Sequence, residues 1–261
     1  DLKGWPAVSA SSFVCFMSKL NNIEVCFSPA LAKFIRIHEN ALVVVVDILR
    51  ATTSIVSALG HGARAVIPAG TPGQAKKLKA EGFPVAAERD GKILDFADFG
   101  NSAFDFMEGQ VRDQKLVFST TNGTVAIETA KKHGEVVLGA FSNISALANW
   151  ISSQQKNVII LCSGWKNTFC LEDTIFAGAL IEKLLKLSPY QIHCDSAAAS
   201  SDLWKIACSD PKFYADKAIH RERLRKLGVD DVLEFSYRMD TSEVVPVLRG
   251  DEIVDISKIG A

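Results

Sequence analysis

The sequence predicts an α/β protein with three layers (α/β/α), in which helices cover both faces of a largely parallel or mixed central sheet. Short apolar runs of strand length alternate with segments of helical character along most of the chain. The clearest run, residues 42–46, is Leu-Val-Val-Val-Val and has no polar alternation. Such a run is typical of a strand buried on both faces of a parallel sheet. At 261 residues, 48% of them hydrophobic, the chain is long enough for one large core or two closely joined lobes.

Strands and helices alternate in the first half of the chain. Thr52 and Thr53 are expected to cap a helix at 54–60, and Thr71 with Pro72 is expected to begin a helix at 71–80. The stretch 91–100 is rich in turn residues and should form an irregular connection. Strands are predicted at 23–27, 42–46, 63–68 and 84–87, and a further helical segment at 28–35.

The second half continues this alternation and then changes character. Strands are predicted at 115–119, 135–138 and 157–162, and helices at 125–133, 142–152 and 175–187. For the last quarter the patterns predict helices at 196–208 and 211–227, edge strands at 232–236 and 244–248, a turn at 249–251 and an apolar segment at 253–254.

The start of the chain does not resemble a folded segment. Residues 1–16 lack both the basic start and the long apolar run of a signal peptide, and Met17 precedes a polar stretch. We therefore expect residues 1–16 to be a non-native or disordered extension and residues 17–261 to form a single domain. The six cysteines show no CxxC spacing, which favours reduced thiols in the cytoplasm over a disulfide framework or a zinc finger.

Charge and composition restrict the expected partners. The formal net charge is −1, and no stretch of the chain forms a basic patch, so a nucleic acid partner is not expected. A membrane partner is not expected either, because the chain lacks a long apolar span. A small molecule is the expected partner, and a homodimer is expected only on the general frequency of such assemblies.

Polar residues follow the run at 42–46 directly. Asp47 stands where the apolar strand ends, and Arg50 and Thr52 come shortly after it. Ligands of open parallel sheets bind beyond the carboxyl ends of the strands, so these three residues are candidates for the site. Arg50 is expected either to pair with Asp47 or to offer a planar fork to phosphate, sulfonate or carboxylate.

The turn at 119–124, Ser-Thr-Thr-Asn-Gly-Thr, lies between a predicted strand and a predicted helix. Backbone N–H groups at a helix start attract anions, small side chains allow close approach, and Gly123 permits unusual dihedral angles. The turn is not a Walker A loop, because no Gly-Lys-Ser/Thr follows. It predicts an anion site, and the alternative is a hydroxyl-rich turn that only caps its helix.

Three acids could form a cation site. Glu172 and Asp173 begin an apolar helix that follows the strand ending at Cys162. If that strand and the strand ending at Asp47 are neighbours, the three carboxylates converge and could hold Mg²⁺ through oxygen. The alternative is that Asp47 is a buried capping acid and the other two are first-turn acids of a helix.

The remaining nucleophile and base candidates are weaker. Cys162, Ser163 and Gly164 could form a nucleophile turn, but a small buried cysteine at a strand end is favoured. The histidines show no metal-binding spacing, and His220, in the segment HRERLRKLG, is the one that could reach a site.

Four motifs together resemble the 2-phosphosulfolactate phosphatase family. They are VVDILRATTSIVSAL at 45–59, STTNGT at 119–124, Cys-Ser-Gly at 162–164 with LEDTIFAGAL at 171–180, and HRERLRKLGVDDV at 220–232, within a resemblance that runs from about 23 to 254. The resemblance implies an α/β/α fold and a magnesium-dependent hydrolase that converts 2-phospho-3-sulfolactate to 3-sulfolactate and phosphate on the route to coenzyme M. One departure is Trp165, where a small or charged residue was expected.

The resemblance carries over to individual residues. Asp47 is the candidate for a covalent nucleophile, if the reaction uses one, or for a metal ligand. The alternatives are a phosphatase of another small 2-phospho acid, a non-catalytic binder of anionic metabolites, and a cysteine hydrolase that uses Cys162. The expected catalytic residues are Asp47, Arg50, Thr120 and Asn122; the substrate-binding residues are Arg50, Thr52, Ser119, Thr120, Thr121, Asn122, Gly123, Ser163 and Gly164; and the Mg²⁺ ligands are Asp47, Glu172 and Asp173.

Overall fold

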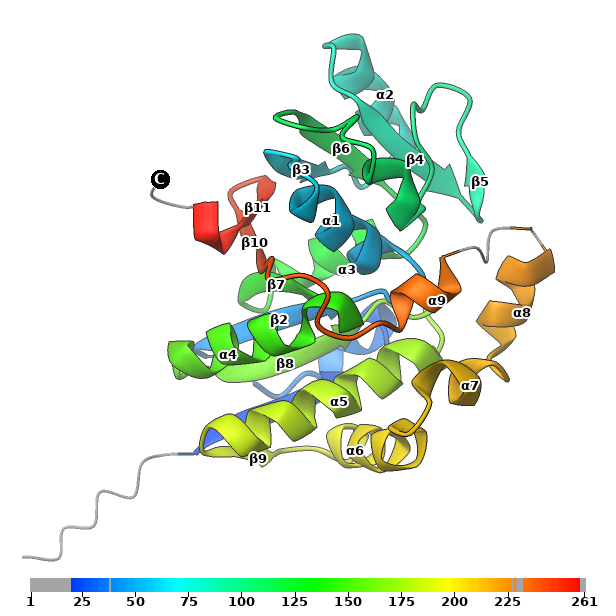
Figure 1. Cartoon of the computed structure of the whole chain (residues 1–261). Coiled ribbons are helices and arrows are strands. Elements are labelled where there is room, and N and C mark those ends of the chain that lie inside the picture. Colours follow the sequence, from blue (N-terminus) through cyan, green and yellow to red (C-terminus); the bar gives the residue numbers. More distant parts are fainter. Residues whose placement is uncertain (1–19, 38, 227, 229–231, 259–261) are drawn as a thin grey trace, which may run out of the picture.

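A computed structural model describes residues 20–37, 39–226, 228 and 232–258 of the chain (Figure 1). The expectations for residues 1–16 and for Met17 lie outside these residues. Within them the strands form one mixed sheet with the order β5-β4-β6-β3-β11-β10-β7-β2-β8-β1-β9. The strands are β1 (Asn21–Cys26), β2 (Ala41–Val46), β3 (Ala65–Pro68), β4 (Val85–Arg89), β5 (Lys92–Ile93), β6 (Lys115–Ser119), β7 (Glu135–Gly139), β8 (Asn157–Cys162), β9 (Tyr190–Ile192), β10 (Pro246–Arg249) and β11 (Glu252–Asp255).

The sheet consists of two parallel blocks joined by a hairpin. One block is β4-β6-β3 and the other is β7-β2-β8-β1-β9. The antiparallel hairpin of β10 and β11 pairs with β7 on one side and with β3 on the other. The prediction of an edge strand at 244–248 is therefore wrong in its placement, because the hairpin closes the middle of the sheet.

Helices cover both faces of the sheet, as the fold class predicted (Figure 1). The α-helices are α1 (Ala51–Gly60), α2 (Pro72–Ala80), α3 (Gly123–Ala130), α4 (Ile144–Gln154), α5 (Leu171–Leu187), α6 (Asp195–Ala207), α7 (Pro211–Ala215), α8 (Ile219–Lys226) and α9 (Leu233–Ser236). Short 3₁₀ helices are η1 (Pro29–Phe34), η2 (Ala103–Phe106), η3 (Phe141–Asn143) and η4 (Ile256–Lys258).

Strand β2 shows why the apolar run has no polar alternation. Leu42, Val44 and Val46 pack into a core with residues of α4, α5 and α6. Val43 and Val45 pack on the opposite face, in a core with residues of α1 and α3. Both sets of side chains are fully buried, so each position of the strand requires an apolar residue.

Two predictions for the last quarter are wrong. The expected strand at 232–236 is the helix α9, and its buried positions Val232, Leu233, Ser236 and Tyr237 follow helical spacing. The expected helix at 211–227 is divided into α7 and α8 by the turn at 216–218. The Asp216 carboxylate in this turn accepts hydrogen bonds from two arginines of α8, and these bonds hold α8 to the turn.

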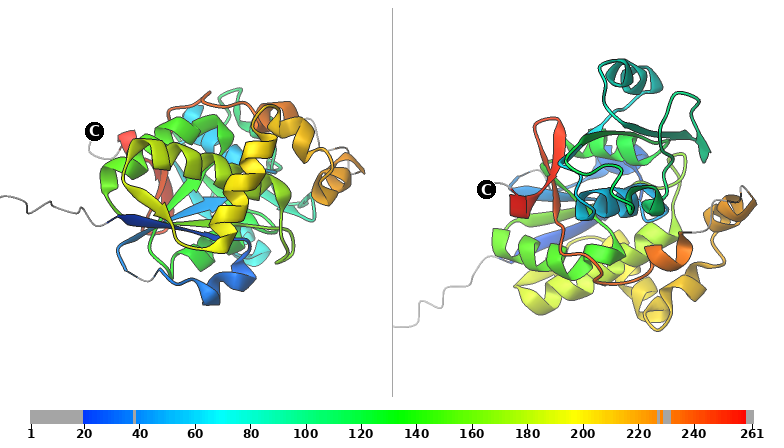
Figure 2. Two further views of the ribbon diagram at one scale, coloured as in Figure 1. Left: turned by 90° about the horizontal axis from the view of Figure 1, so that it is seen from below. Right: turned by 45° about the horizontal axis from the view of Figure 1, so that its top comes forward.

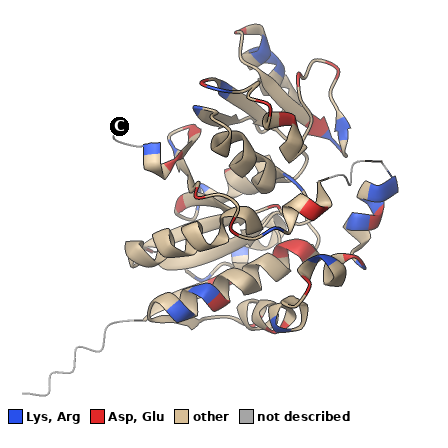
Figure 3. Ribbon diagram, viewed as in Figure 1, with Lys and Arg blue, Asp and Glu red and all other residues tan. Residues whose placement is uncertain are grey.

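The segment that carries α8 stands clear of the sheet in all three ribbon views (Figure 2). Figure 3 shows that α8 carries several Lys and Arg residues and that acidic residues stand at the start of α5. Among the described residues, none of the helices has the length and hydropathy needed to cross a lipid bilayer.

Candidate active site

The ends of β2 and β8 lie side by side, which is the condition under which the predicted acids can meet. Val46 pairs with Cys162 in parallel register, and Ser163 N donates to Val46 O at 2.7 Å. Asp173 ties the two strand ends together, because Oδ1 accepts from Ile48 N at 3.0 Å and Oδ2 accepts from Gly164 N at 3.1 Å. Burial and the nearby charges of Asp47 and Glu172 raise the pKa of Asp173 well above its usual value.

Asp47 begins the helix that follows β2. Its Oδ1 accepts from Ala51 N at 3.1 Å, and its backbone exchanges two hydrogen bonds with the hydroxyl of Thr52. The expectation that Thr52 and Thr53 cap a helix beginning at 54 is therefore wrong. Because Asp47 supplies the cap, α1 begins at Ala51, and both threonines are buried within its first turn.

The Asp47 carboxyl is buried and lies close to other charged side chains. Burial raises its pKa to about 6, although the Ala51 N–H and His220 act in the opposite direction. Glu88 and Glu172 add further negative potential. Because this pKa lies below 7, the carboxyl is mostly ionised at neutral pH.

Gly123 allows α3 to approach Asp47 and α1. A β-carbon at position 123 would lie 2.5 Å from Ala51 Cβ, 3.0 Å from Asp47 Oδ2 and 3.1 Å from Thr120 Oγ1. Gly123 does not adopt a positive φ, so the reason for glycine is close packing and not the unusual dihedral angles that we predicted. The glycine thus lets two helix N-termini meet around one carboxylate.

The hydroxyl-rich turn before α3 is partly occupied by the protein itself. Thr121 N donates to Glu88 Oε1 at 2.8 Å, and Ser119 Oγ donates to Ala69 O. Thr120 Oγ1 is buried and has no hydrogen-bond partner among the described residues. Asn122 gives α3 no side-chain cap, so the first N–H groups of this helix, from Gly123 onward, remain for an anion.

Helix α8 brings His220 to the acids, as the sequence allowed. His220 Nδ1 lies 2.7 Å from Glu172 Oε1, and Arg223 Nη2 lies 3.0 Å from His220 Nε2. A guanidinium only donates, so Nε2 accepts and the imidazole proton is on Nδ1, facing Glu172. Burial acts to raise the pKa of Glu172, but the hydrogen bond from His220 opposes burial, and that pKa stays below its usual value. Glu172 Oε2 is buried without a partner in the described part of the chain.

One group of potential metal ligands converges within the described residues. Cys170 Sγ, a Glu172 oxygen and His220 Nδ1 lie within 4.8 Å of one another. A metal-binding imidazole normally donates its second N–H to an acceptor, whereas Nε2 of His220 faces the donor Arg223. The group is therefore best described as hydrogen-bonded, and the oxygens that fit a hard cation are those of Asp47 and Glu172 Oε2.

These residues surround a small pocket of about 20 Å³. The sequence assigned no individual role to three of its polar residues, namely Glu88, Asn101 and Arg223. Glu88 directly follows the apolar run of the strand predicted at 84–87, a signal that could have identified it, although the structure places Glu88 inside β4. Asn101 Oδ1 is buried without a partner in the described part of the molecule. Asp47, Arg50, Thr120 and Asn122 also line the pocket, whereas Thr52, Ser119, Thr121, Gly123, Ser163, Gly164, Glu172 and Asp173 lie behind or beside its walls.

Cys162 does not have the properties of a nucleophile. Its side chain is fully buried, and burial together with the charge of Asp173 raises the pKa of its thiol well above the usual value. The sequence favoured a small buried cysteine at this strand end over a nucleophile turn, and the burial of Cys162 agrees with that prediction. Ser163 is also buried, and its Oγ has no partner among the described residues.

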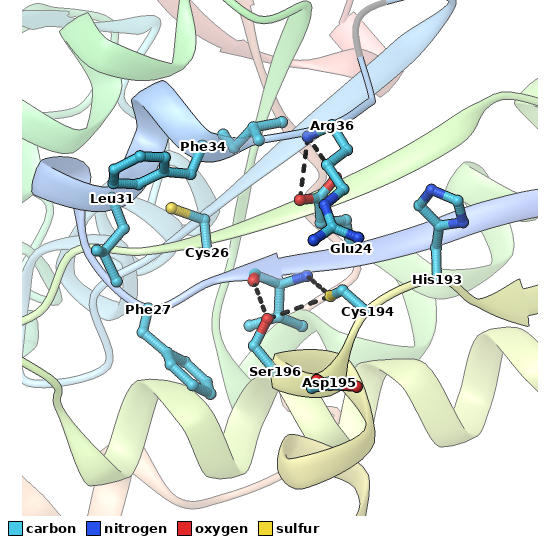
Figure 4. Close-up of a pocket in the computed structure, with 12 residues that line it drawn as sticks. Glu24, Cys26, Phe27, Leu31, Phe34, Arg36, His193, Cys194, Asp195 and Ser196 are labelled. Atoms are coloured by element: carbon cyan, nitrogen blue, oxygen red, sulfur yellow. Dashed lines mark hydrogen bonds between the residues drawn. The ribbon is translucent and has the colours of Figure 1, made fainter.

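A second cavity, of about 330 Å³, lies between β1, η1 and the start of α6 (Figure 4). Two of its polar side chains are already paired: both oxygens of Glu24 accept from Arg36 N, and Ser196 Oγ donates to Val25 O.

Comparison with known proteins shows the family of the chain. The family model described as 2-phosphosulpholactate phosphatase matches residues 26–251. The chain belongs to the 2-phosphosulfolactate phosphatase family. The match to this family includes every segment that lines the pocket, from Asp47 to Leu224. The resemblance seen in the four motifs is thereby confirmed, together with its enzyme class, the phosphoric monoester hydrolases.

Three relatives carry the name "Probable 2-phosphosulfolactate phosphatase". The protein of Prochlorococcus marinus is 37% identical over 215 residues, which cover 79% of this chain and 88% of the relative. The protein of Caldanaerobacter subterraneus subsp. tengcongensis is 34% identical over 211 residues, which cover 79% of this chain and 87% of the relative. The protein of Pseudothermotoga lettingae is 32% identical over 234 residues, which cover 89% of this chain and 98% of the relative.

Proposed function

We propose that the protein is a magnesium-dependent phosphatase that hydrolyses 2-phospho-3-sulfolactate to 3-sulfolactate and phosphate, the type of reaction used in coenzyme M biosynthesis. The observation that carries this proposal is the meeting of a buried acid, Asp47, with Arg50 and the uncapped start of α3 at the strand ends. Membership of the family and the names of the relatives support the substrate.

The buried acids support a divalent cation. Asp47 and Glu172 raise each other's cost of ionisation, and Glu172 Oε2 is buried without a partner in the described residues. Both offer carboxylate oxygens, which Mg²⁺ prefers. Asp173 is the third acid of the predicted set, but each of its oxygens already accepts a backbone hydrogen bond. When bound, Mg²⁺ would supply positive charge to the phosphoryl oxygens.

Other residues of the pocket would bind the phosphoryl group during cleavage of the ester bond. The Arg50 guanidinium, Thr120 Oγ1 and the first N–H groups of α3 bind the phosphoryl oxygens. The ester bond between phosphorus and the 2-oxygen breaks, and the alkoxide takes up a proton to give 3-sulfolactate. Whether water attacks directly or after transfer to Asp47, one water oxygen ends on the released phosphate.

Phosphate release from 2-phospho-3-sulfolactate and from 2-phospholactate tests the substrate. We expect release from both, with a higher kcat/KM for the sulfonate. A higher value for 2-phospholactate would refute the sulfonate preference and would favour the second candidate, a phosphatase of another small 2-phospho acid. Trp165 favours this second candidate, because a small or charged residue was expected at this position in a 2-phosphosulfolactate phosphatase.

Arg50→Lys should impair both substrates equally. The residue is 6% exposed and lines the pocket beside Asp47, so lysine keeps the charge but loses the planar fork. Because the phosphoryl group is common to both substrates, we expect kcat/KM to fall by roughly 10- to 100-fold for each. Steady-state assays with both substrates check this. A loss confined to the sulfonate substrate would contradict the assignment of Arg50 to the phosphoryl group.

A further inference from the structure

The pocket at the strand ends is small in this structure. Its volume of about 20 Å³ accommodates little more than one water molecule. A three-carbon acid with phosphate, carboxylate and sulfonate groups needs far more space, since ligand pockets usually measure roughly 300 Å³ or more. The pocket must therefore widen, by movement of one of its walls, to hold the whole substrate.

Helix α8 forms that wall. His220, Arg223 and Leu224 of α8 line the pocket, and the helix stands clear of the sheet in each ribbon view (Figure 2). Leu224 is the one residue of α8 that packs into the apolar core. The two side chains of α8 that face the pocket make polar contacts instead: His220 contacts Glu172 of α5, and Arg223 Nη1 donates to Asp90 O at 3.0 Å. Polar contacts of this kind form and break more readily than the contacts of a packed apolar core.

Arg223 has hydrogen-bonding capacity that the protein does not use. Its Nη1 and Nη2 groups donate to Asp90 O and His220 Nε2, but its Nε is buried without a partner in the described part of the chain. The charges around the guanidinium are those of Glu88 and Asp90 and, with a smaller effect, of Arg50. A buried N–H donor of a charged group that has no acceptor at the wall of a pocket indicates a place for an anion.

Trp165 fixes the orientation of Arg223. The guanidinium carbon lies 3.7 Å from the centroid of the indole ring, and the ring also stacks on His220 at 5.0 Å. A cation on the face of an indole is favourable, and stacking keeps the planar fork in one orientation. The residue that departs from the pattern expected of the family thus has a defined place in this chain, as the platform for Arg223.

We propose that Arg223 binds the sulfonate of the substrate, and that α8 is the lid that delivers it when the pocket closes. The inference rests on the proposed function. Arg50 and the start of α3 lie on the side of Asp47 and serve the phosphoryl group, whereas Arg223 approaches from the lid. One guanidinium for one sulfonate also matches the charge of the group that distinguishes this substrate from 2-phospholactate.

Arg223→Gln tests the proposal by substrate discrimination. Loss of a charge-assisted hydrogen bond should lower kcat/KM for 2-phospho-3-sulfolactate by roughly 30- to 100-fold and that for 2-phospholactate by less than about threefold. Arg223→Lys should recover part of the loss. An equal loss on both substrates would show that Arg223 only orients His220 or the lid, and an unchanged kcat/KM would show that it does not contact the substrate; either result overturns the proposal.

Arg225→Gln is the matched control. Arg225 lies on the same helix, is exposed, and donates to Asp216 outside the pocket at 3.1 Å. Its replacement should leave kcat/KM unchanged for both substrates. If it reproduces the discrimination seen with Arg223→Gln, the effect belongs to the overall charge of α8 and the specific role of Arg223 is refuted.

Binding of 3-sulfolactate separates this inference from the proposed function. Calorimetric titration with 3-sulfolactate and with lactate does not need turnover. We expect 3-sulfolactate to bind at least about tenfold more weakly to Arg223→Gln than to the unaltered protein, with no such difference for lactate. If neither phosphorylated substrate is hydrolysed but this difference is found, the proposed function fails and the role of Arg223 stands. Equal binding of 3-sulfolactate to both proteins overturns that role.

Discussion

Asp47→Asn is expected to abolish turnover and to make the folded protein more stable. The carboxylate lies between the start of α1 and the start of α3, where the phosphoryl group is proposed to bind. As nucleophile or as metal ligand it must be ionised, and asparagine cannot take either role at neutral pH. We expect kcat to fall by roughly 10³-fold or more.

The gain in stability follows from the raised pKa. Burial raises the pKa of Asp47 from 3.8 to about 6, so the folded state holds this proton at pH values where the unfolded chain has released it. The free energy of unfolding therefore falls as pH rises from about 4 to about 6 and then stays lower. At pH 7 the cost of this ionised carboxylate is about 3 kcal/mol, which the neutral amide avoids while its oxygen still accepts from Ala51 N.

Denaturation curves of the two proteins at several pH values measure this difference. The unfolding free energies should coincide near pH 3 to 4 and diverge as pH rises to about 6, with Asp47→Asn the more stable protein. Addition of Mg²⁺ should stabilise the unaltered protein only. Two results would refute the described environment of Asp47. One is an Asp47→Asn protein that retains turnover. The other is an unfolding free energy, relative to that of the unaltered protein, that is lower at pH 7 than at pH 4.

Glu172→Gln is expected to lose activity without the gain in stability. Its Oε1 accepts from His220, and the amide oxygen of glutamine can still do so. The substitution removes the negative charge at Oε2, which has no partner among the residues that the structure describes. We expect kcat to fall by roughly 10²- to 10³-fold and the Mg²⁺ concentration for half-maximal rate to rise.

The direction of the stability change separates the two acids. His220 holds the pKa of Glu172 below its usual value, so the ionised form contributes stability above the unfolded pKa of about 4.5, and that stability is lost as pH falls through the folded pKa. Glu172→Gln should therefore be less stable than the unaltered protein at pH 7. Thermal unfolding of both variants under one buffer condition gives the comparison, and a Glu172→Gln protein with full activity and unaltered Mg²⁺ dependence would remove this residue from the site.

The parts of the fold that sequence could predict are those with local signals. The apolar runs that form β2, β6 and β8 can be recognised in the sequence, because both faces of a central strand are buried and no polar alternation interrupts the run. The polar residue that follows each run marks the edge of the sheet where ligands bind. Asp47, Thr120 and Ser163 were found in this way. Glu88 directly follows the apolar run at 85–87 and could have been found by the same rule, although it lies inside β4 in the structure.

The parts that sequence could not predict depend on contacts between distant segments. The hairpin of β10 and β11 looks like an edge feature, because nothing local shows that two parallel blocks need a connection. Arg223 is one of several arginines on a polar helix, and only the fold places its guanidinium against Trp165 and His220. Gly123 was recognised as important, but its packing partner Ala51 comes from a helix 72 positions earlier, so the reason for glycine could not be predicted.

The central claim is that the acids at the strand ends catalyse phosphate release with a divalent cation. Its most direct test is the rate of phosphate release from 2-phospho-3-sulfolactate by the full chain, measured in Mg²⁺, after removal of the ion with a chelator, and after its return. We predict release that stops with the chelator and recovers when Mg²⁺ is restored. Release that continues unchanged in the chelator, or no release from this substrate under any of the three conditions, would contradict the account.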